Sequence, residues 1–302
     1  MFYSVSFLRS QMGKYIKNPT LLKIKNAVQD VIYSVPRQYL MRRTSTFAEK
    51  YDIIQGERFE KLADNERIFY RHTHEVNNFF RDPPAKEFVL ISHNSDRKVT
   101  ENPKEDGDAD ITLMPPGLVK WFSQNVDVEH DKVESIPIGL ENSRWFPAVR
   151  KIEKIISRAS KKKNFINWLY LNHNVKTNPQ ERTSPYALFK NKGWCTLESG
   201  GNNYKFDHYL AQLYNHRFVL SPEGNGMDTH RAWEALYLNT IPIEKRNNNN
   251  RFYTDLPICF VDDWEEVTLD FLEREYERIN RSNWNLEKLK FSYWKDKILG
   301  SI

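Results

Sequence analysis

The chain has 302 residues, of which 39% are hydrophobic and 28% are charged, and its formal net charge is +5 at pH 7. This length and composition are typical of one large or two smaller folded domains and exclude a chain that is disordered throughout. The mild positive charge suits an anionic ligand such as a nucleotide diphosphate. A nucleic-acid-binding protein usually shows a denser stripe of Lys and Arg, so nucleic acid is not the expected partner.

Cysteine usage and hydropathy predict a soluble, cytoplasmic protein. Cys195 and Cys259 lie far apart and have no partner His at metal-ligand spacing, so neither a disulfide framework nor a metal site is expected. A reducing compartment is the default for such a chain. No stretch approaches the roughly 20 apolar residues of a membrane span. The apolar start, Met1 to Leu8, is too short for a signal peptide and lacks a basic region before it.

The first part of the chain predicts helices followed by strands. In residues 1–48, which are basic, Leu21, Ile24, Val28 and Ile32 fall at helical spacing. Short apolar runs bounded by polar or turn residues come next, and such runs are typical of buried strands in a mostly parallel sheet. The predicted strands are 51–54, 68–70, 88–92, 111–114 and 135–138, and residues 118–125 are predicted to form a helix between them.

A second cycle of strands and helices begins after the polar stretch 151–163. The predicted strands are 167–172, 218–221, 241–244 and 258–261, and the predicted helices are 185–192, 205–214 and 229–238. The last forty residues predict further helix, and the polar run Asn247–Asn250 predicts a mobile loop. This alternation predicts an α/β fold with two βα-type domains.

The stretch from Phe218 to Ile243 carries the strongest functional signal. It reads FVLSPEGNGMDTHRAWEALYLNTIPI, in which a strand is followed by a loop with two glycines and then by a helix capped by Asp228 or Thr229. Such a unit places free backbone N–H groups and the positive end of a helix beside the carboxyl edge of a sheet, where a diphosphate is stabilised. Gly224 and Gly226 allow the backbone to approach a ligand closely.

Three side chains of this stretch add specificity. Arg231 can neutralise diphosphate charge, although it can also simply pair with Glu234 on the same helical face. A carboxylate at Glu234 can hold both ribose hydroxyls of a nucleotide, and Glu223 can accept hydrogen bonds from sugar hydroxyls. An isolated glutamate is more often an ordinary surface or ion-paired side chain, so the prediction of a donor site depends on the three residues together.

The same stretch resembles the donor-site motif of exostosin-type glycosyltransferases, a group with the GT-B fold. Three further segments resemble other parts of that fold: FVLISHNSD at Phe88–Asp96, SIPIGLEN at Ser135–Asn142 and LYLNHNVKTNPQER at Leu169–Arg182. Together they cover roughly residues 50 to 265. The chain also resembles the small exostosin-like enzymes of large algal DNA viruses, a group that includes a xylosyltransferase.

The resemblance implies two Rossmann-like domains that face a cleft. Residues 1–155 would form the acceptor-side domain, residues 156–270 would bind the nucleotide sugar, and helices in residues 271–302 would pack back toward the first domain. The implied donor is a UDP-sugar, with UDP-xylose as one candidate, and the implied acceptor is an oligosaccharide or glycoprotein in the cytoplasm, which would be the host cytoplasm for a viral protein. Cellular exostosins carry a membrane anchor that is not expected here.

The resemblance also implies inversion at the anomeric carbon, which needs a base on the acceptor side and positive groups at the leaving diphosphate. Asp96 is the first candidate for the base and His93 the second, ahead of Glu57, His72, His74 and Glu75. The diphosphate would be met by Arg231, by Arg182 and by the loop and helix start that contain Gly224, Asn225, Gly226 and Asp228. One departure concerns Glu223, because ten residues separate it from Glu234 where the common GT-B pattern has seven.

Metal-independent transfer is expected. Asp108 and Asp110 lie in an acidic loop with no apolar strand before them, and Asp262 and Asp263 predict a helix cap rather than a metal site. Two other functions stay open. The chain could bind a glycan or nucleotide without turnover, and the basic first 48 residues could bind nucleic acid, including in a DNA-modifying glucosyltransferase.

Overall fold

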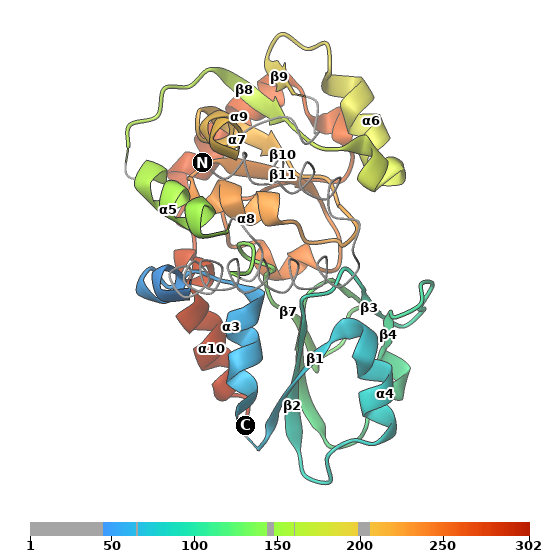
Figure 1. The fold of residues 1–302 in the computed structure, drawn as a ribbon. Helices are drawn as coiled ribbons and strands as arrows, with labels where there is room; N and C mark the ends of the chain where they lie inside the picture. The colour runs from blue at the N-terminus through green and yellow to red at the C-terminus, as the bar shows by residue number, and fades with distance from the viewer. Residues whose placement is uncertain (1–44, 65, 144–147, 160, 199–205) are drawn as a thin grey trace, which may run out of the picture.

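The computed structural model describes residues 45–64, 66–143, 148–159, 161–198 and 206–302 (Figure 1). The helices predicted for residues 1–44, with Leu21, Ile24, Val28 and Ile32, lie outside the described residues. Every strand pairing in the described chain is parallel apart from one isolated antiparallel bridge between Gln55 and Gly139. The predicted α/β class with parallel sheets is therefore confirmed.

The first sheet is built on the apolar run that begins at Phe88. In the described chain its order is β1-β2-β5-β7. The side chains of β2 alternate between two faces, since Val89 and Ile91 belong to one buried cluster and Phe88 and Leu90 to another. The strands are β1 (Ile68–His72), β2 (Phe88–His93), β5 (Leu118–Ser123) and β7 (Val133–Ser135), with helices α3 (Gly56–Glu60) and α4 (Val76–Arg81) and 3₁₀ helices η1 (Lys61–Asp64) and η2 (Thr73–Glu75).

Three predictions for this half are wrong, and the strand predicted for residues 135–138 is displaced, since β7 spans Val133–Ser135. The helix predicted for residues 118–125 is strand β5, because its buried Trp121 and Phe122 take up opposite faces between β2 and β7. The strand predicted for residues 51–54 is a turn, and Ile111–Leu113 forms 3₁₀ helix η3, capped by the Asp110 side chain. Short apolar runs bury equally well in several conformations, so periodicity does not separate them.

A small sheet continues the first half toward the second. In the described residues its order is β4-β3-β6, with β3 (Val99–Thr100), β4 (Ala109–Asp110) and β6 (Val126–Asp127). Asp108 holds this region together, because its buried carboxylate accepts hydrogen bonds from the backbone N–H groups of Lys98, Lys104 and Glu105. The Asp108 carboxylate, the first of the two considered above as a possible metal motif, is therefore already engaged by backbone N–H groups.

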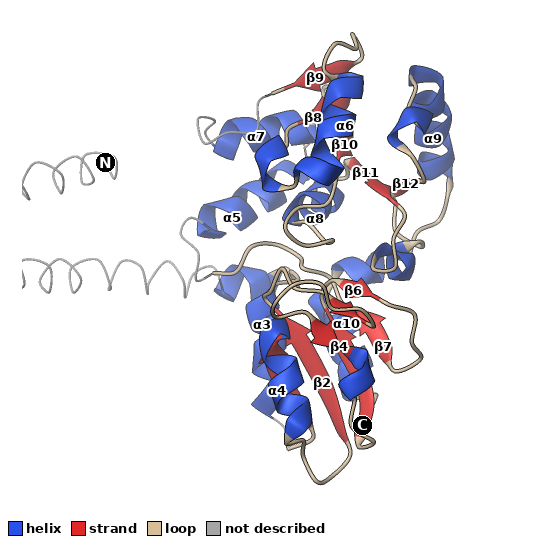
Figure 2. Cartoon of the chain, turned by 90° about the vertical axis from the view of Figure 1, so that its right-hand side faces the viewer, coloured by secondary structure: helices blue, strands red, loops and turns tan. Residues whose placement is uncertain are grey.

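The second sheet has the order β12-β11-β10-β8-β9 among the described strands. Its strands are β8 (Asn167–Leu171), β9 (Cys195–Leu197), β10 (His216–Leu220), β11 (Ile241–Lys245) and β12 (Cys259–Val261). Tyr170 and Val219 face one buried cluster with side chains of α5, α7 and α8, whereas Leu169 and Phe218 face another that includes α6 and α9. Figure 2 shows α9 on one side of this sheet and α5, α7 and α8 on the other.

The helices of this half confirm most of the prediction. They are α5 (Ala148–Ala159), η4 (Val175–Thr177), α6 (Pro179–Phe189), α7 (Phe206–Tyr214), α8 (His230–Tyr237), η5 (Asn250–Tyr253), η6 (Trp264–Glu266), α9 (Leu269–Arg281), η7 (Leu286–Leu289) and α10 (Phe291–Leu299). Helix α6 begins six residues earlier than the predicted start at Pro185, since Asn178 caps it and Pro179 takes the first helical position. Asp263 caps η6 in a capping box, which confirms the cap predicted there.

The last helix, α10, lies beside α3 of the first half (Figure 1). The rings of Phe59 and Phe291 are 5.1 Å apart between centroids. The backbone N–H of Phe291 donates to the carbonyl of Asp52 at 2.9 Å, and the N–H of Ser292 donates to the Asp52 carboxylate at 3.1 Å. The C-terminal end of the chain is thus fixed to residues near the start of the described part.

Two buried asparagines join the halves. Asn125 adopts a left-handed conformation, with φ 57°, donates from Nδ2 to the carbonyl of Ser95 at 3.0 Å and accepts at Oδ1 from the N–H of Asp228 at 2.9 Å. Asn249 accepts from the N–H of Val126 and from the hydroxyl of Ser135. The prediction of a mobile loop at Asn247–Asn250 is wrong at its end, because Asn249 and Asn250 are buried and hydrogen-bonded.

We expect Gly226→Ala to destabilise the protein by about 1–3 kcal/mol, as is typical of overpacking. An added Cβ would lie 2.6 Å from Nδ2 of Asn125, whose hydrogen bonds on both sides prevent it from moving away. Gly193→Ala is the control, since an added Cβ there meets no atom within 4 Å. Denaturant unfolding of both variants tests the expectation, and equal midpoints would contradict it.

Candidate functional site

The loop after β10 has a defined local structure. Helix α8 begins after Thr229, whose hydroxyl lies 2.8 Å from that of Ser221 and does not cap the helix through its side chain. Within the loop, the N–H of Gly224 donates to the carbonyl of Gly226 at 2.9 Å. The loop therefore brings the first turn of α8 to the carboxyl edge of the second sheet, as the sequence predicts for an anion site.

A pocket of about 330 Å³ lies at this helix start. Three of the predicted donor-site residues, Arg182, Arg231 and Glu234, line it together. They come from α6 and α8, which follow β8 and β10 at the same edge of the sheet. The remaining lining residues are Phe206, Tyr209, Thr229 and His230.

The two arginines give the pocket its positive charge. Arg182 is buried and donates from Nε to the carbonyl of Glu223 at 2.7 Å and from Nη1 to that of Asn174 at 3.1 Å. Burial, and secondly the charge of Arg231, lowers the pKa of Arg182 to about 10. Arg231 donates to the carbonyl of Asn172, and its buried Nε has no hydrogen-bond partner in the described structure. Neither guanidinium forms an ion pair with a described carboxylate, so the alternative considered for Arg231, an ion pair with Glu234, is not formed.

Glu234 is the carboxylate of the pocket. It is buried, and the hydroxyl of Tyr209 donates to its Oε2 at 2.7 Å. Burial, and secondly the charge of Glu234, raises the pKa of Tyr209 well above its ordinary value, so the tyrosine stays a neutral donor. Tyr209 therefore fixes the orientation of the carboxylate at the wall of the pocket.

His230, the first residue of α8, is a pocket residue that the sequence offered only as part of the helix start at Asp228–His230, with no role for its side chain. Its Nδ1 lies 2.8 Å from the carbonyl oxygen of Gly139, so in the neutral ring Nδ1 carries the proton and Nε2 the lone pair. Nε2 forms no hydrogen bond to any residue that the structure describes. Its position directly before Arg231 was the available signal, because the first residue of a helix lies at its anion-binding end.

The tip of the loop faces the first half of the chain. Asn225 is exposed and its Nδ2 donates to Oδ2 of Asp96, also exposed, at 3.3 Å. Glu223 lies outside the pocket lining and accepts from Nδ2 of Asn247 at 2.9 Å. Burial raises the pKa of Glu223, while Lys98 and Asn247 act in the opposite direction. An added Cβ at Gly224 would lie 3.0 Å from Nη2 of Arg182, so the loop backbone lies directly against the pocket arginine.

Two predicted site residues have structural positions instead. Asp228 is neither the helix cap nor a pocket residue, since its buried carboxylate accepts from the N–H of Ile138 at 2.7 Å and from Nε1 of Trp233 at 2.8 Å. His93 is buried with both ring nitrogens engaged, Nδ1 by the N–H of Asn94 at 2.7 Å and Nε2 by the carbonyl of Pro137 at 3.0 Å. Burial lowers the pKa of His93 to about 4, so this histidine does not suit the role of a base.

No arrangement for a metal ion is found in the described residues. They contain no group of three or more His, Cys, Asp and Glu side chains that could hold an ion. His72, His74 and Glu75 lie close together in sequence and are potential ligands, and the rings of the two histidines stack 5.6 Å apart. The Glu75 carboxylate, however, accepts from the backbone N–H of His72 in a capping box. None of the described helices is both long and apolar enough to cross a membrane.

Comparison with known proteins does not assign the chain to a family. No family model matches the chain, and a search of curated proteins finds no significant match.

A second carboxylate of this region, Glu244 of β11, is half-buried. A small internal cavity is lined by Glu244, Asp228, Trp233 and Asn250. Asn250 donates to Glu244 at 3.3 Å. Burial, and secondly the charge of Asp228, raises the pKa of Glu244 to about 8. Burial also raises the pKa of Asp228, to about 7, against the bonds from Ile138 and Trp233.

We expect Glu244→Gln to be more stable than the unaltered protein at alkaline pH. A carboxyl whose pKa is raised by folding binds its proton more tightly in the folded state, so its contribution to stability falls as the pH rises from about 4.5 and levels off above about 8. The glutamine of the variant has no proton to lose, so its contribution to stability does not fall with pH. Thermal unfolding at intervals from pH 5 to 9 tests it: the difference in Tm between the two proteins should widen with pH, and a constant difference would contradict it.

Proposed function

We propose that the protein is an inverting glycosyltransferase that transfers a sugar from a UDP-sugar to a hydroxyl group of a glycan. The observation that supports this most is the pair of arginines, Arg182 and Arg231, held at the start of α8 without a carboxylate partner in the described chain. Two neighbouring cations that form no ion pair with a described carboxylate are stabilised by a bound anion, and the N–H groups of the helix start favour the same ligand. Glu234 in the same pocket supplies an acceptor for ribose hydroxyls.

We further propose a GT-B arrangement for the two halves. Residues 1–155 would form the acceptor-side domain around the first sheet, residues 156–270 the donor-side domain around the second, and residues 271–302 the return to the first domain. Supporting contacts are the hydrogen bond between Asp96 and Asn225 across the two halves and the packing of Phe291 on Phe59.

In the proposed reaction, the donor diphosphate lies against Arg182, Arg231 and the start of α8. The acceptor oxygen attacks the anomeric carbon, a new glycosidic bond forms, and the bond from that carbon to the diphosphate oxygen breaks. The two arginines stabilise the negative charge of the leaving UDP. Asp96, opposite the donor loop, takes the acceptor proton. Protein cations here take the part that a metal ion has in other transferases, and xylose is one candidate for the sugar.

A binding protein without turnover is the second candidate. It is favoured by one observation, that Asp96 is exposed and bonded to Asn225 and does not line the pocket that would hold the donor. Slow hydrolysis of a UDP-sugar in the absence of acceptor distinguishes the two candidates, because a transferase activates the donor and a binding protein does not.

We expect Glu234→Gln to weaken UDP binding by about tenfold or more, because hydrogen bonds to a charged group are typically worth about 1.5–3 kcal/mol. Glutamine keeps the shape of the side chain and one acceptor for Tyr209 but loses the charge that two ribose hydroxyls would share. Glu273→Gln, on the exposed surface of α9, is the matched control. Calorimetric titration with UDP measures both, and equal affinities would remove Glu234 from the donor site.

We expect Asp96→Asn to leave UDP affinity unchanged and to lower the rate of sugar transfer by roughly 10²–10⁴, the usual effect of losing a general base. Asparagine preserves a hydrogen-bond partner for Asn225, so the contact between the halves is retained. Transfer assays with radiolabelled donor, together with UDP titration, test both parts. A variant that transfers at the normal rate would mean that the base is another residue.

A further inference from the structure

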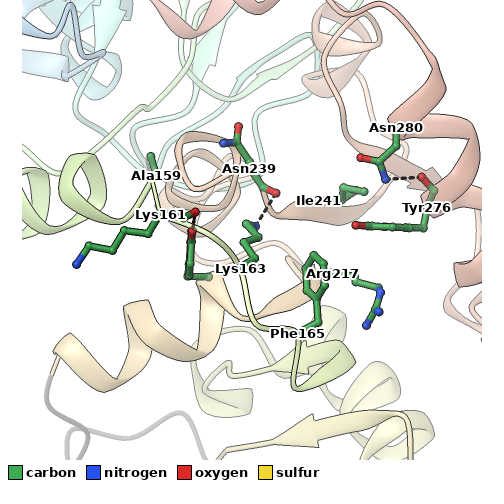
Figure 3. A pocket seen from close by; sticks show the side chains of 10 residues that line it. Ala159, Lys161, Lys163, Phe165, Arg217, Asn239, Ile241, Tyr276 and Asn280 are labelled. Atoms are coloured by element: carbon green, nitrogen blue, oxygen red, sulfur yellow. Dashed lines mark hydrogen bonds between the residues drawn. The ribbon is translucent and has the colours of Figure 1, made fainter.

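A second pocket, of about 270 Å³, lies at the other edge of the second sheet (Figure 3). Arg217 and Ile241, at the starts of β10 and β11, line it, whereas the candidate donor pocket follows the ends of the strands. Strands of five residues separate the two edges by roughly 15 Å. Lys163, just before β8, and Tyr276 and Asn280 of α9 line the same pocket. The second pocket is therefore separate from the candidate donor pocket.

Aromatic rings stack against the guanidinium group of Arg217. Its guanidinium carbon lies 4.4 Å from the ring centroids of both Phe165 and Trp168 and 5.6 Å from that of Tyr276. Arg217 forms no hydrogen bond or ion pair with any residue in the described part of the chain. Stacking orders the planar cation while the N–H groups at its edge stay available, which is the usual preparation for binding a carboxylate or phosphate.

Lys163 adds a second fixed cation. Its ammonium group donates to the carbonyl of Asn239 at 2.7 Å (Figure 3). It also donates to the hydroxyl of Thr240 at 2.9 Å. These partners are neutral, and burial lowers the pKa of Lys163 to about 8. Lys161 also lines the pocket, and no described lining residue is acidic. Among the described residues, the pocket thus offers positive charge with no acidic side chain in its lining, which favours an anionic ligand.

We propose that this pocket binds a single anionic sugar unit, either a sugar acid or a sugar phosphate, through Arg217 and Lys163. Its volume is slightly below the ~300 Å³ at the lower end of small-molecule sites, which fits one ring and excludes a whole nucleotide. The amides of Asn239 and Asn280 line the pocket as partners for hydroxyl groups, and the aromatic walls suit the apolar face of a sugar. Carboxylate and phosphate make the same charge-assisted contacts with the two cations.

The test is a titration of the full chain, first without UDP and then with an excess of UDP to fill the proposed donor pocket. The probes are glucuronate, glucose 6-phosphate, uncharged glucose and inorganic phosphate. At least one charged sugar should bind ten times more tightly than glucose and than inorganic phosphate. Binding of glucuronate alone would identify a sugar acid as the ligand, and binding of glucose 6-phosphate alone a sugar phosphate.

Two variants locate the binding. Lys163→Gln keeps a donor for Asn239 but removes the charge, and should weaken the charged sugar at least fivefold. Lys162→Gln, an equal change of charge at the exposed neighbour, should leave it unchanged. The proposal is overturned by the absence of binding, by equal effects of the two variants, by inorganic phosphate binding as well as the sugars, or by release of the sugar when UDP is added. No readout involves sugar transfer, so these results are independent of the proposed enzymatic function.

Discussion

The hydrogen bonds of Asn125 and Asp228 are the constraint on which the site depends. Asn125, left-handed and buried at the end of β5, accepts the N–H of Asp228 and donates to Ser95. Asp228 in turn accepts from Ile138 of the first half and Trp233 of α8. Because Asp228 bonds both to loops that follow strands of the first sheet and to the helix that begins the pocket, these bonds tie the donor loop to both. A buried polar group that loses a hydrogen-bond partner destabilises the folded state, so Asn125 and Asp228 need all of these bonds.

Hydrogen bonding divides the ionisable residues of this region into two kinds. Asp228 and His93 are buried with their polar atoms fully engaged, so they hold the structure and are closed to a ligand. Arg182 and Arg231 are anchored by backbone carbonyls, which fix their positions without neutralising their charge. A cation held in this way is poised for an anion, because no carboxylate has to be displaced when the ligand arrives. The same principle, with aromatic rings as the anchor, operates at Arg217.

Periodicity and turn chemistry were enough to predict much of the second half. The strands at Asn167, Phe218 and Ile241 follow from apolar runs, and α8 follows from the loop with Gly224 and Gly226 before it. The first half was predicted less well, because LVKWFS at residues 118–123 has hydrophobic positions compatible with both helix and strand, and pairing with β2 and β7 decided between them. The asparagine run at 247–250 was predicted to be a mobile loop for a related reason. Asparagine is common both in solvated loops and at buried positions where its amide forms several hydrogen bonds, as at Asn249.

By itself, the sequence determined the parallel α/β class and the chemistry offered at the start of α8, since strand length, glycine placement and helix caps are local properties. It also placed Arg182, Arg231 and Glu234 among the site candidates, from residue type and position in a motif. Only the tertiary structure decided that these three share one pocket, that His230 joins them, and that His93 and Asp228 are closed. Burial and hydrogen-bond partners supplied by segments 40 to 130 residues away in the chain control those outcomes, and no local pattern records them.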